Sequence, residues 1–202
     1  MRIFRPPVRI LFLALTSCFL ATLATSLRAQ ESALESSFQA AVESAHGLSY
    51  NAVWMPPNEL APLRMDCSNT AQWLKRSCQR IYLPRTASAQ YLLCQQTRRL
   101  FSASHNPETL RQRLQTGDLL FWKNTYHPER KPPITHVMIY LGRDSQGQMW
   151  MAGSQTSHGV AIYHFHPDKP MGGYRFFFGL FKCKGQFIAY GRPSDSPTSS
   201  IQ

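Results

Sequence analysis

Residues 67–81, which read CSNTAQWLKRSCQRI, decide the fold because they join a helical pattern to a reactive side chain at its first position. The apolar side chains recur at steps of four and three residues: Cys67, Ala71, Leu74, Cys78 and Ile81. This spacing predicts an amphipathic helix with one core-facing stripe. The same pattern places Lys75, Arg76 and Arg80 outside the core. We therefore expect Cys67 to open the helix on its buried side.

One further helix is expected on each side of this segment. Apolar residues at helical spacing between positions 34 and 45 predict a first helix, and Gly47 supplies its end. A third helix is expected from Ser88 to about Phe101. The segment 49–64 is expected to form a loop, because its prolines prevent a continuous helix.

The chain beyond Gly117 changes to short apolar runs separated by Gly, Pro, Asn and Asp clusters, a texture typical of strands. The five runs are 118–122, 135–141, 148–152, 159–165 and 186–190, and DSQG at 144–147 is expected to turn between two of them. Helices followed by strands predict an α+β fold, with N-terminal helices packed on a mostly antiparallel sheet of five to six strands. The irregular stretches 123–133 and 168–184 are expected as loops, either around a cleft or on the surface.

The first 29 residues have the features of an export signal. Arginines at positions 2, 5 and 9 precede an almost wholly apolar or small stretch over 10–23, and the sequence SLRA offers a cleavage point after Ala29. A rival interpretation is a lipoprotein signal with Cys18 as the lipid-bearing residue; it ranks second because the apolar run continues past that cysteine. A permanent membrane span is less favoured, because a helix needs roughly 18 to 20 apolar residues to cross.

The mature protein is therefore expected to be exported to the periplasm or cell envelope. One domain would occupy residues 30–193, and a disordered Ser/Pro-rich tail would follow over 194–202. The whole chain has 22 Lys and Arg against 11 Asp and Glu. Removal of the signal leaves 18 basic and 11 acidic residues, a formal charge of +7. That charge suits an anionic polymer such as cell wall or nucleic acid, but the basic residues are scattered and no nucleic-acid motif is present.

Four cysteines follow the signal: Cys67, Cys78, Cys94 and Cys183. They are too few to staple a chain of this length, and burial is expected for Cys78 and Cys94, with a disulfide left open. His164 and His166 share one face of a predicted strand but lack a third ligand, so no metal site is expected. No cofactor is expected either, since the chain has no phosphate-binding glycine loop. The sequence leaves the oligomeric state open.

Cys67 and His136 are the candidate pair for nucleophilic chemistry. The N-terminus of a helix offers unpaired N–H groups and a dipole, which favour a thiolate and can hold an oxyanion. An imidazole on a rigid element across a cleft can share the thiol proton. Alternation in the predicted strand divides its side chains between two faces: His136, Met138 and Tyr140 on one, and Val137, Ile139 and Leu141 on the other. The alternative for both residues is a buried core position.

Four short segments occur in a fixed order: MDCS at 65–68, LPRT at 83–86, TGDLLFW at 116–122 and THVMIYLG at 135–142. Together they resemble the successive landmarks of the NlpC/P60 family of cysteine peptidases. AYGRP at 189–193 is similar to the last strand of that family. The resemblance covers about residues 45–193 and implies a papain-like core.

The resemblance also implies roles for individual residues. Cys67 would be the nucleophile, and His136 the general base that later protonates the leaving amine. Asp66 would fix the turn into the helix, and Ser68 would lie beside the nucleophile. Tyr50 is the best match to a tyrosine that commonly reaches the active site in this family.

The chain departs from the family pattern at two positions. Asn69 stands where the family usually has Gly, which a helix start tolerates. Met151 stands where the family usually supplies a polar residue, often His, that orients the imidazole, and a thioether is a poor acceptor. Either a dyad works alone, or activity is lost, or a neighbouring residue takes the role, for which the candidates are Gln155, Ser154 and His158.

The resemblance and the export signal together predict a thiol protease that acts on peptidoglycan or muropeptides. The expected reaction cleaves stem peptides, at a γ-D-glutamyl bond to a diamino acid, through an acyl-thioester on Cys67. One alternative is a catalytically silent wall-binding or regulatory module, motivated by Met151. Another is an amidase or acyltransferase that uses Cys67 and His136 on a different acyl substrate.

Overall fold

A computed structural model describes residues 8–51, 64–103, 106–127, 130–176 and 181–194. The helices of this part of the chain are α1 (Val8–Ser44), α2 (Cys67–Gln79), α3 (Ala87–Gln96) and α4 (Pro107–Arg113). Its strands are β1 (Leu100–Ser102), β2 (Leu119–Lys123), β3 (Ile134–Arg143), β4 (Met149–Gln155), β5 (Gly159–His164), β6 (Gly173–Phe176), β7 (Phe181–Lys184) and β8 (Gln186–Gly191).

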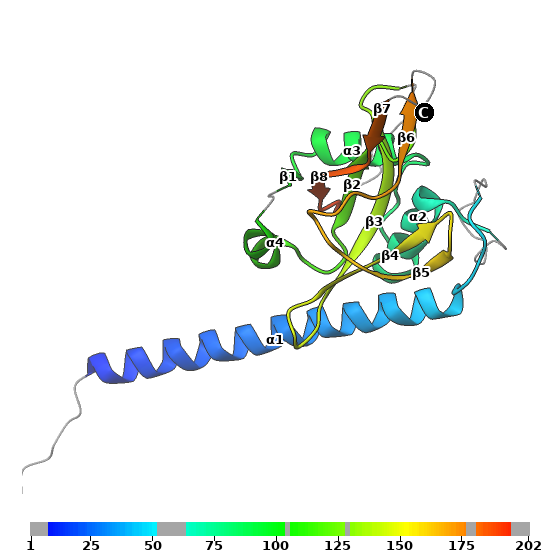
Figure 1. Cartoon of the computed structure of the whole chain (residues 1–202). Coiled ribbons are helices and arrows are strands. Elements are labelled where there is room, and N and C mark those ends of the chain that lie inside the picture. Colours follow the sequence, from blue (N-terminus) through cyan, green and yellow to red (C-terminus); the bar gives the residue numbers. More distant parts are fainter. Residues whose placement is uncertain (1–7, 52–63, 104–105, 128–129, 177–180, 195–202) are drawn as a thin grey trace, which may run out of the picture.

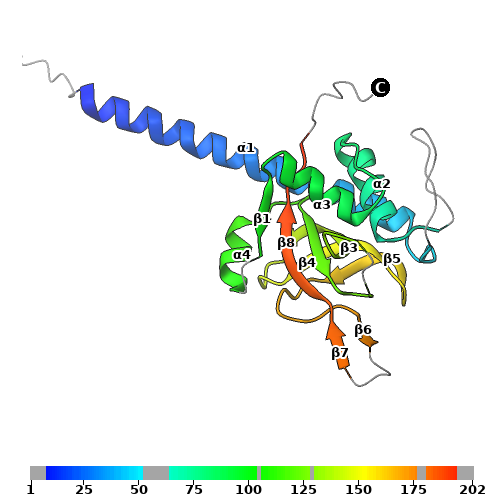
Figure 2. The same cartoon turned by 90° about the horizontal axis from the view of Figure 1, so that it is seen from above.

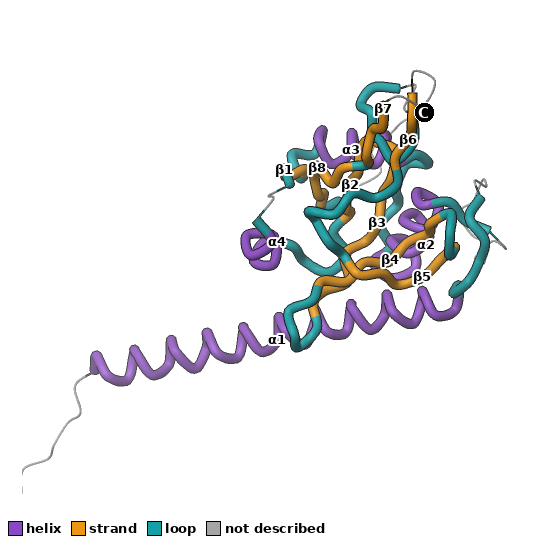
Figure 3. The backbone as a smooth tube through the Cα atoms, viewed as in Figure 1, coloured by secondary structure: helices purple, strands orange, loops and turns teal. Residues whose placement is uncertain are grey.

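Six strands form the main sheet in the order β1-β8-β2-β3-β4-β5, and every neighbouring pair is antiparallel. The expected α+β class is therefore confirmed, and the helices lie around the strands in Figure 3. All five predicted strands are present, with ends that differ by at most three residues. The predicted turn also forms, since the Asp144 N–H donates to the Gln148 carbonyl and Gly147 has a φ of 77°.

Helix α1 begins far upstream of the predicted start at Leu34. Its last turns pack on the domain through Phe38 and Val42, which are fully buried. Its earlier turns project away from the rest of the molecule (Figure 1), and Leu23 and Leu27 are exposed there. The cleavage point expected after Ala29 falls within this helix and stays a prediction. Among the described residues, no helix combines the length and apolar character needed to cross a membrane.

Helix α2 forms as predicted, with one correction. Lys75 was expected outside the core, yet only 2% of its surface is exposed. Its Nζ donates to the Gly117 carbonyl at 3.0 Å and to the Gln79 side chain. The butyl stem is buried while the ammonium finds carbonyl acceptors, which is how a lysine can occupy an interior position. Arg80 stays exposed and ends the helix in the left-handed conformation, with a φ of 57°.

The segment 87–113 departs most from expectation. Helix α3 ends at Gln96 rather than near Phe101, because Arg98 adopts a φ of 56° and turns the chain into β1. Helix α4, capped by the Asn106 side chain, was not predicted. The stretch 168–184, expected as a loop, contains the β6–β7 hairpin, which lies at the end of the domain remote from α1 (Figures 1 and 2).

Two apolar clusters cover the two faces of the sheet. The first lies toward α1, α2 and α3, and includes Cys67, Val137 and Ile139. The second includes α4 residues and Trp122, Met138 and Tyr140. The predicted alternation of β3 is thus confirmed for its apolar residues. It puts Val137 on the α2 side, immediately after His136 in the chain.

Candidate active site

Asp66 builds the start of α2. Its side chain caps the helix by accepting the Asn69 N–H at 2.7 Å, and the Ser68 hydroxyl donates to the same carboxylate at 3.0 Å. The Asp66 carbonyl also accepts from the Thr70 hydroxyl at 2.9 Å. A carboxylate in this place satisfies free N–H groups and complements the helix dipole. Cys67 is therefore held at a fixed first helical position.

Arg85 reinforces this helix start. Its guanidinium contacts both Asp66 carboxylate oxygens, at 2.8 and 3.3 Å, and donates to the Ser68 hydroxyl at 2.9 Å. The paired geometry restricts the carboxylate more than a single contact would. Sequence reasoning quoted Arg85 within the LPRT segment but gave it no role. The contact joins positions 19 residues apart, which residue spacing does not reveal.

The Cys67 thiol lies in a buried pocket beside β3. Only 5% of the residue is exposed, and burial raises the pKa of the thiol to about 11, with a further increase from the Asp66 charge. Hydrogen bonds from the backbone of Val137, the Tyr50 hydroxyl and the backbone of Ser68 oppose this rise in pKa. Tyr50 Oη lies 4.0 Å from Sγ. The pKa reduction expected from the helix terminus is thus outweighed by desolvation, and the resting sulfur is protonated at neutral pH.

The His136 ring lies in an apolar environment. The residue is 7% exposed, and burial lowers the pKa of the imidazole to about 4, against an upward influence from Asp66. Trp122 lies opposite on β2, with the two ring centroids 6.0 Å apart and the planes at 70°. The His136 Nε2 is buried and has no hydrogen-bond partner among the residues that the structure describes. The resting imidazole is therefore neutral and lacks a polar group at this nitrogen.

Backbone packing relates Cys67 to His136. The Val137 N–H, the next peptide group after His136, forms a hydrogen bond to the Cys67 sulfur. Within the described residues, no hydrogen bond joins Sγ to the imidazole itself. The structure thus brings the helix start and this segment of β3 together, with both side chains in uncharged forms.

The third-position candidates lie at different places along β4. Met151 pairs with Tyr140, four residues along β3 from His136, a separation of roughly 13 Å for an extended chain. The paired register ends at Ile139 and Ala152. Extending it by three residues would bring Gln155 level with His136. Opposite residues of antiparallel strands project to the same face, so Gln155 is the candidate whose position best suits the ring.

The two other candidates are less well placed. The Ser154 hydroxyl is buried and unpartnered, but alternation assigns it to the opposite face of β4 from Gln155. His158 lies in the turn before β5, where its Nδ1 is 2.6 Å from the Ser157 hydroxyl.

A cavity of about 330 Å³ adjoins Cys67. Its lining includes the helix start and also Tyr126, Arg130 and Thr135, to which sequence reasoning gave no role. Tyr126 and Arg130 belong to the basic, proline-rich stretch 123–133, so one of the two stretches considered as cleft loops does line this cavity. The full lining is Tyr50, Asp66, Cys67, Ser68, Arg85, Thr86, Ala87, Tyr126, Arg130 and Thr135.

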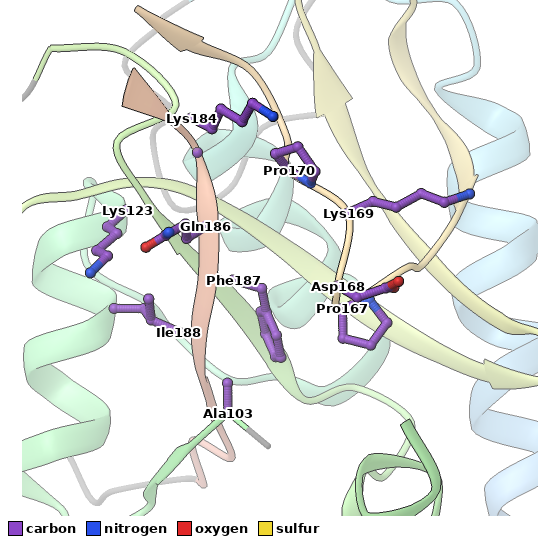
Figure 4. A pocket seen from close by; sticks show the side chains of 11 residues that line it. Ala103, Lys123, Pro167, Asp168, Lys169, Pro170, Lys184, Gln186, Phe187 and Ile188 are labelled. Atoms are coloured by element: carbon purple, nitrogen blue, oxygen red, sulfur yellow. The ribbon is translucent and has the colours of Figure 1, made fainter. Parts of the chain in front are cut away.

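A second cavity, of about 480 Å³, lies between β8 and the segment 167–170 (Figure 4). Phe187 and Pro167 project toward one another inside it, while the ammonium groups of Lys123, Lys169 and Lys184 point in different directions. None of the predicted site residues lines it. Its larger volume therefore does not make it the better candidate, because it lacks a nucleophile and the lysines do not converge.

Across the described residues, no group of three or more His, Cys, Asp or Glu side chains forms a potential metal site. Cys67, Cys78, Cys94 and Cys183 are free thiols. Cys94 is buried, as expected, and Cys78 is half-buried, with its Sγ 3.6 Å from the Ser37 carbonyl. The chemistry available in the cavity is thus that of a thiol and two guanidinium groups. His136 is not among the lining residues, and the link from β3 to the sulfur is the Val137 backbone.

Comparison with known proteins gives one positive finding. The sequence model of the NlpC/P60 family matches residues 53–171, more than half of the chain. The match spans Asp66, Cys67, Arg85, His136 and Met151. A search of curated proteins gives no match.

Proposed function

The chain belongs to the NlpC/P60 family, and we propose that it is an exported cysteine peptidase that hydrolyses peptide bonds in peptidoglycan stem peptides. Membership supports a peptidase-type function directed at the cell wall in general terms. The single observation that carries the finer proposal is the cavity beside α2, in which Cys67 occupies the first helical position next to β3. The γ-D-glutamyl bond to a diamino acid remains the proposed point of cleavage.

The proposed reaction uses Cys67 and His136 in two stages. The thiol proton passes to the imidazole as sulfur attacks the carbonyl carbon, and N–H groups of the first turn of α2 stabilise the oxyanion. Collapse of the tetrahedral intermediate breaks the C–N bond, and the imidazolium gives its proton to the leaving amine. Water then attacks the thioester with His136 as base, releasing the carboxylic acid and restoring the thiol.

Substrate binding would have to accompany the first proton transfer. Burial keeps the pKa of Cys67 at about 11 and that of His136 at about 4, so the resting pair is neutral rather than a thiolate and an imidazolium. A substrate carbonyl gives the developing negative charge a new location beside the helix N-terminus. We therefore propose that proton transfer and attack on the carbonyl are coupled.

A second candidate function is a catalytically silent module that binds or regulates at the cell wall. The observation that favours it is the unpartnered His136 Nε2, the atom that a third polar residue would otherwise hold. Cys/His pairs can transfer acyl groups without a third member, so this observation alone does not remove the peptidase. An amidase or acyltransferase on the same scaffold would share the intermediate and differ in its products.

Mass spectrometry of muropeptides incubated with residues 30–202 tests the peptidase. We expect new amine and carboxylate ends from the native protein and none from Cys67→Ala. Cys78→Ala is the matched control, because Cys78 lies on the same helix but does not line the cavity. Absence of cleavage by the native protein, or equal cleavage by Cys67→Ala, would refute the proposal; retained binding to isolated sacculi without cleavage would support the silent module.

A further inference from the structure

Two arginines line the cavity beside Cys67, and they differ in their partners. Arg85 pairs with the Asp66 carboxylate and with the Ser68 hydroxyl. Arg130 donates to the phenol oxygen of Tyr126, a neutral group. Among the ion pairs of the described residues, none includes Arg130. Arg85 thus has its charge matched by Asp66, whereas within the described part of the chain no carboxylate is paired with Arg130.

Arg130 is also held in position at the cavity. Its guanidinium carbon lies 5.8 Å from the centre of the Tyr126 ring, a distance that allows a cation–π contact in addition to the hydrogen bond. Tyr126 itself lies within electrostatic reach of Cys67 and Asp66: burial raises the pKa of its phenol, Arg130 opposes that change, and the charges of Cys67 and Asp66 add to it. The guanidinium is therefore anchored on Tyr126 at the cavity that Cys67 also lines.

The backbone around Tyr126 is supported from two sides. The Thr125 N–H donates to the Thr135 hydroxyl at 2.8 Å, and the Gly173 N–H donates to the Thr125 carbonyl at 2.8 Å. His127 also packs edge-on against Tyr174 of β6, with the ring centroids 5.1 Å apart. The β6–β7 hairpin thus backs the loop that carries Tyr126.

The charges of the cavity add to a positive total. Asp66 is the acidic lining residue, while Arg85 and Arg130 are basic. Asp66 and Arg85 neutralise each other, which leaves the Arg130 charge. A guanidinium recognises a carboxylate through paired N–H donors, and it interacts much more weakly with a neutral carboxamide of nearly the same shape.

We propose that Arg130 is a specificity residue that binds a free carboxylate of the substrate near the scissile bond. This inference rests on the proposed peptidase function and adds a substrate class, namely stem peptides whose carboxyl group next to the cleaved linkage is not amidated. Arg85 has a different role in this scheme, since it positions Asp66 and the start of α2.

Two synthetic stem peptides that differ only by carboxylate or carboxamide at that group provide the test. We expect native protein to favour the carboxylate in kcat/KM by about tenfold, a value suited to a partly exposed charged hydrogen bond. Arg130→Gln should abolish this preference, chiefly by lowering kcat/KM for the carboxylate peptide. Arg130→Lys should retain part of the preference. Arg85→Gln should lower activity toward both peptides alike.

Binding measured by calorimetry with Cys67→Ala separates the inference from the proposed reaction. Tighter binding of the carboxylate peptide that disappears in the Cys67→Ala, Arg130→Gln double variant supports the inference even when native protein cleaves neither peptide, a result that would refute only the peptidase. Cleavage with equal preference for both peptides, or an unchanged preference in Arg130→Gln, overturns the inference alone. If neither peptide binds and neither is cleaved, both the inference and the proposed peptidase function are overturned.

Discussion

The surroundings of Cys67 and of His136 differ in chemistry although their backbones meet. The sulfur is approached by a hydroxyl and two backbone N–H groups, beside a helix start fixed by Asp66 and Arg85. The imidazole lies against Trp122, and its Nε2 has no partner. The nucleophile is thus held by polar contacts, while the base is positioned by packing alone. Fixed orientation of a base ordinarily comes from a hydrogen bond on its far nitrogen.

This difference arises because local sequence determines the surroundings of Cys67, whereas strand pairing determines those of His136. Asp66, Cys67 and Ser68 are consecutive, so the helix cap and the nucleophile form together from local sequence. The neighbour of His136 in the sheet, Trp122, comes from β2, where register decides which side chain faces the ring. A single polar-to-apolar change on β4 can remove a partner from His136 without affecting the helix start.

Replacement of the base, His136, should have the largest effect on the rate of cleavage. His136→Ala is expected to lower kcat for muropeptide cleavage by about 10² to 10⁴-fold, because a general base contributes in that range. His164→Ala serves as control, since His164 stacks on Trp150 and lies on β5, away from the β3 segment whose backbone contacts Cys67. Rates from product analysis check the effect, and an unaltered kcat in His136→Ala would assign the proton transfer to another group.

Acid should destabilise the protein through the apolar environment of His136. Its folded-state pKa, about 4, lies below the unfolded value of 6.5, so the unfolded chain binds the proton first as pH falls. The associated stability is present above pH 6.5 and is lost as pH falls from 6.5 toward 4, by about 3 kcal/mol at pH 4.

Urea unfolding across this pH range measures that loss. His136→Phe keeps an apolar ring in the site and removes the titration, so its unfolding free energy should fall less than that of the native protein. If the unfolding free energies of the two proteins depend on pH in the same way, the imidazole is solvated or hydrogen-bonded in solution.

Thiol modification should reveal the raised pKa of Cys67, a shift in the opposite direction from that of His136. With a pKa of about 11 against an ordinary value of 9.0, Cys67 should alkylate about a hundredfold more slowly at pH 8 than the same cysteine in the unfolded chain. Its rate should continue to rise above pH 9. Peptide mapping after timed iodoacetamide treatment follows Cys67 separately from the other thiols. Rapid labelling near pH 6 would instead indicate a resting thiolate and contradict the coupled proton transfer proposed above.

Sequence reasoning reached the parts of the molecule that depend on local pattern. The α2 helix and the alternation of β3 follow from residue spacing, and the helix start follows from the order of Asp66 and Cys67. The burial of Lys75 was missed because its acceptor, the Gly117 carbonyl, lies 42 positions away. Arg130 was missed as a cavity residue for a similar reason, since only the folded loop brings it beside Cys67.

A carboxylate introduced at position 155 should give the His136 imidazole a polar contact, as the Cys67 sulfur already has. Gln155→Glu would offer Nε2–H an acceptor, raise the pKa of the imidazole and increase kcat by roughly threefold to tenfold, the smallest effect considered, because orientation improves without a new reacting group. Gln155→Ala should change kcat by less than about twofold, since Nε2 has no partner to lose. Steady-state kinetics on one muropeptide compares the three proteins. A large loss of kcat in Gln155→Ala would mean that Gln155 already holds the His136 ring during turnover. The difference between the surroundings of Cys67 and His136 would then apply only to the resting protein.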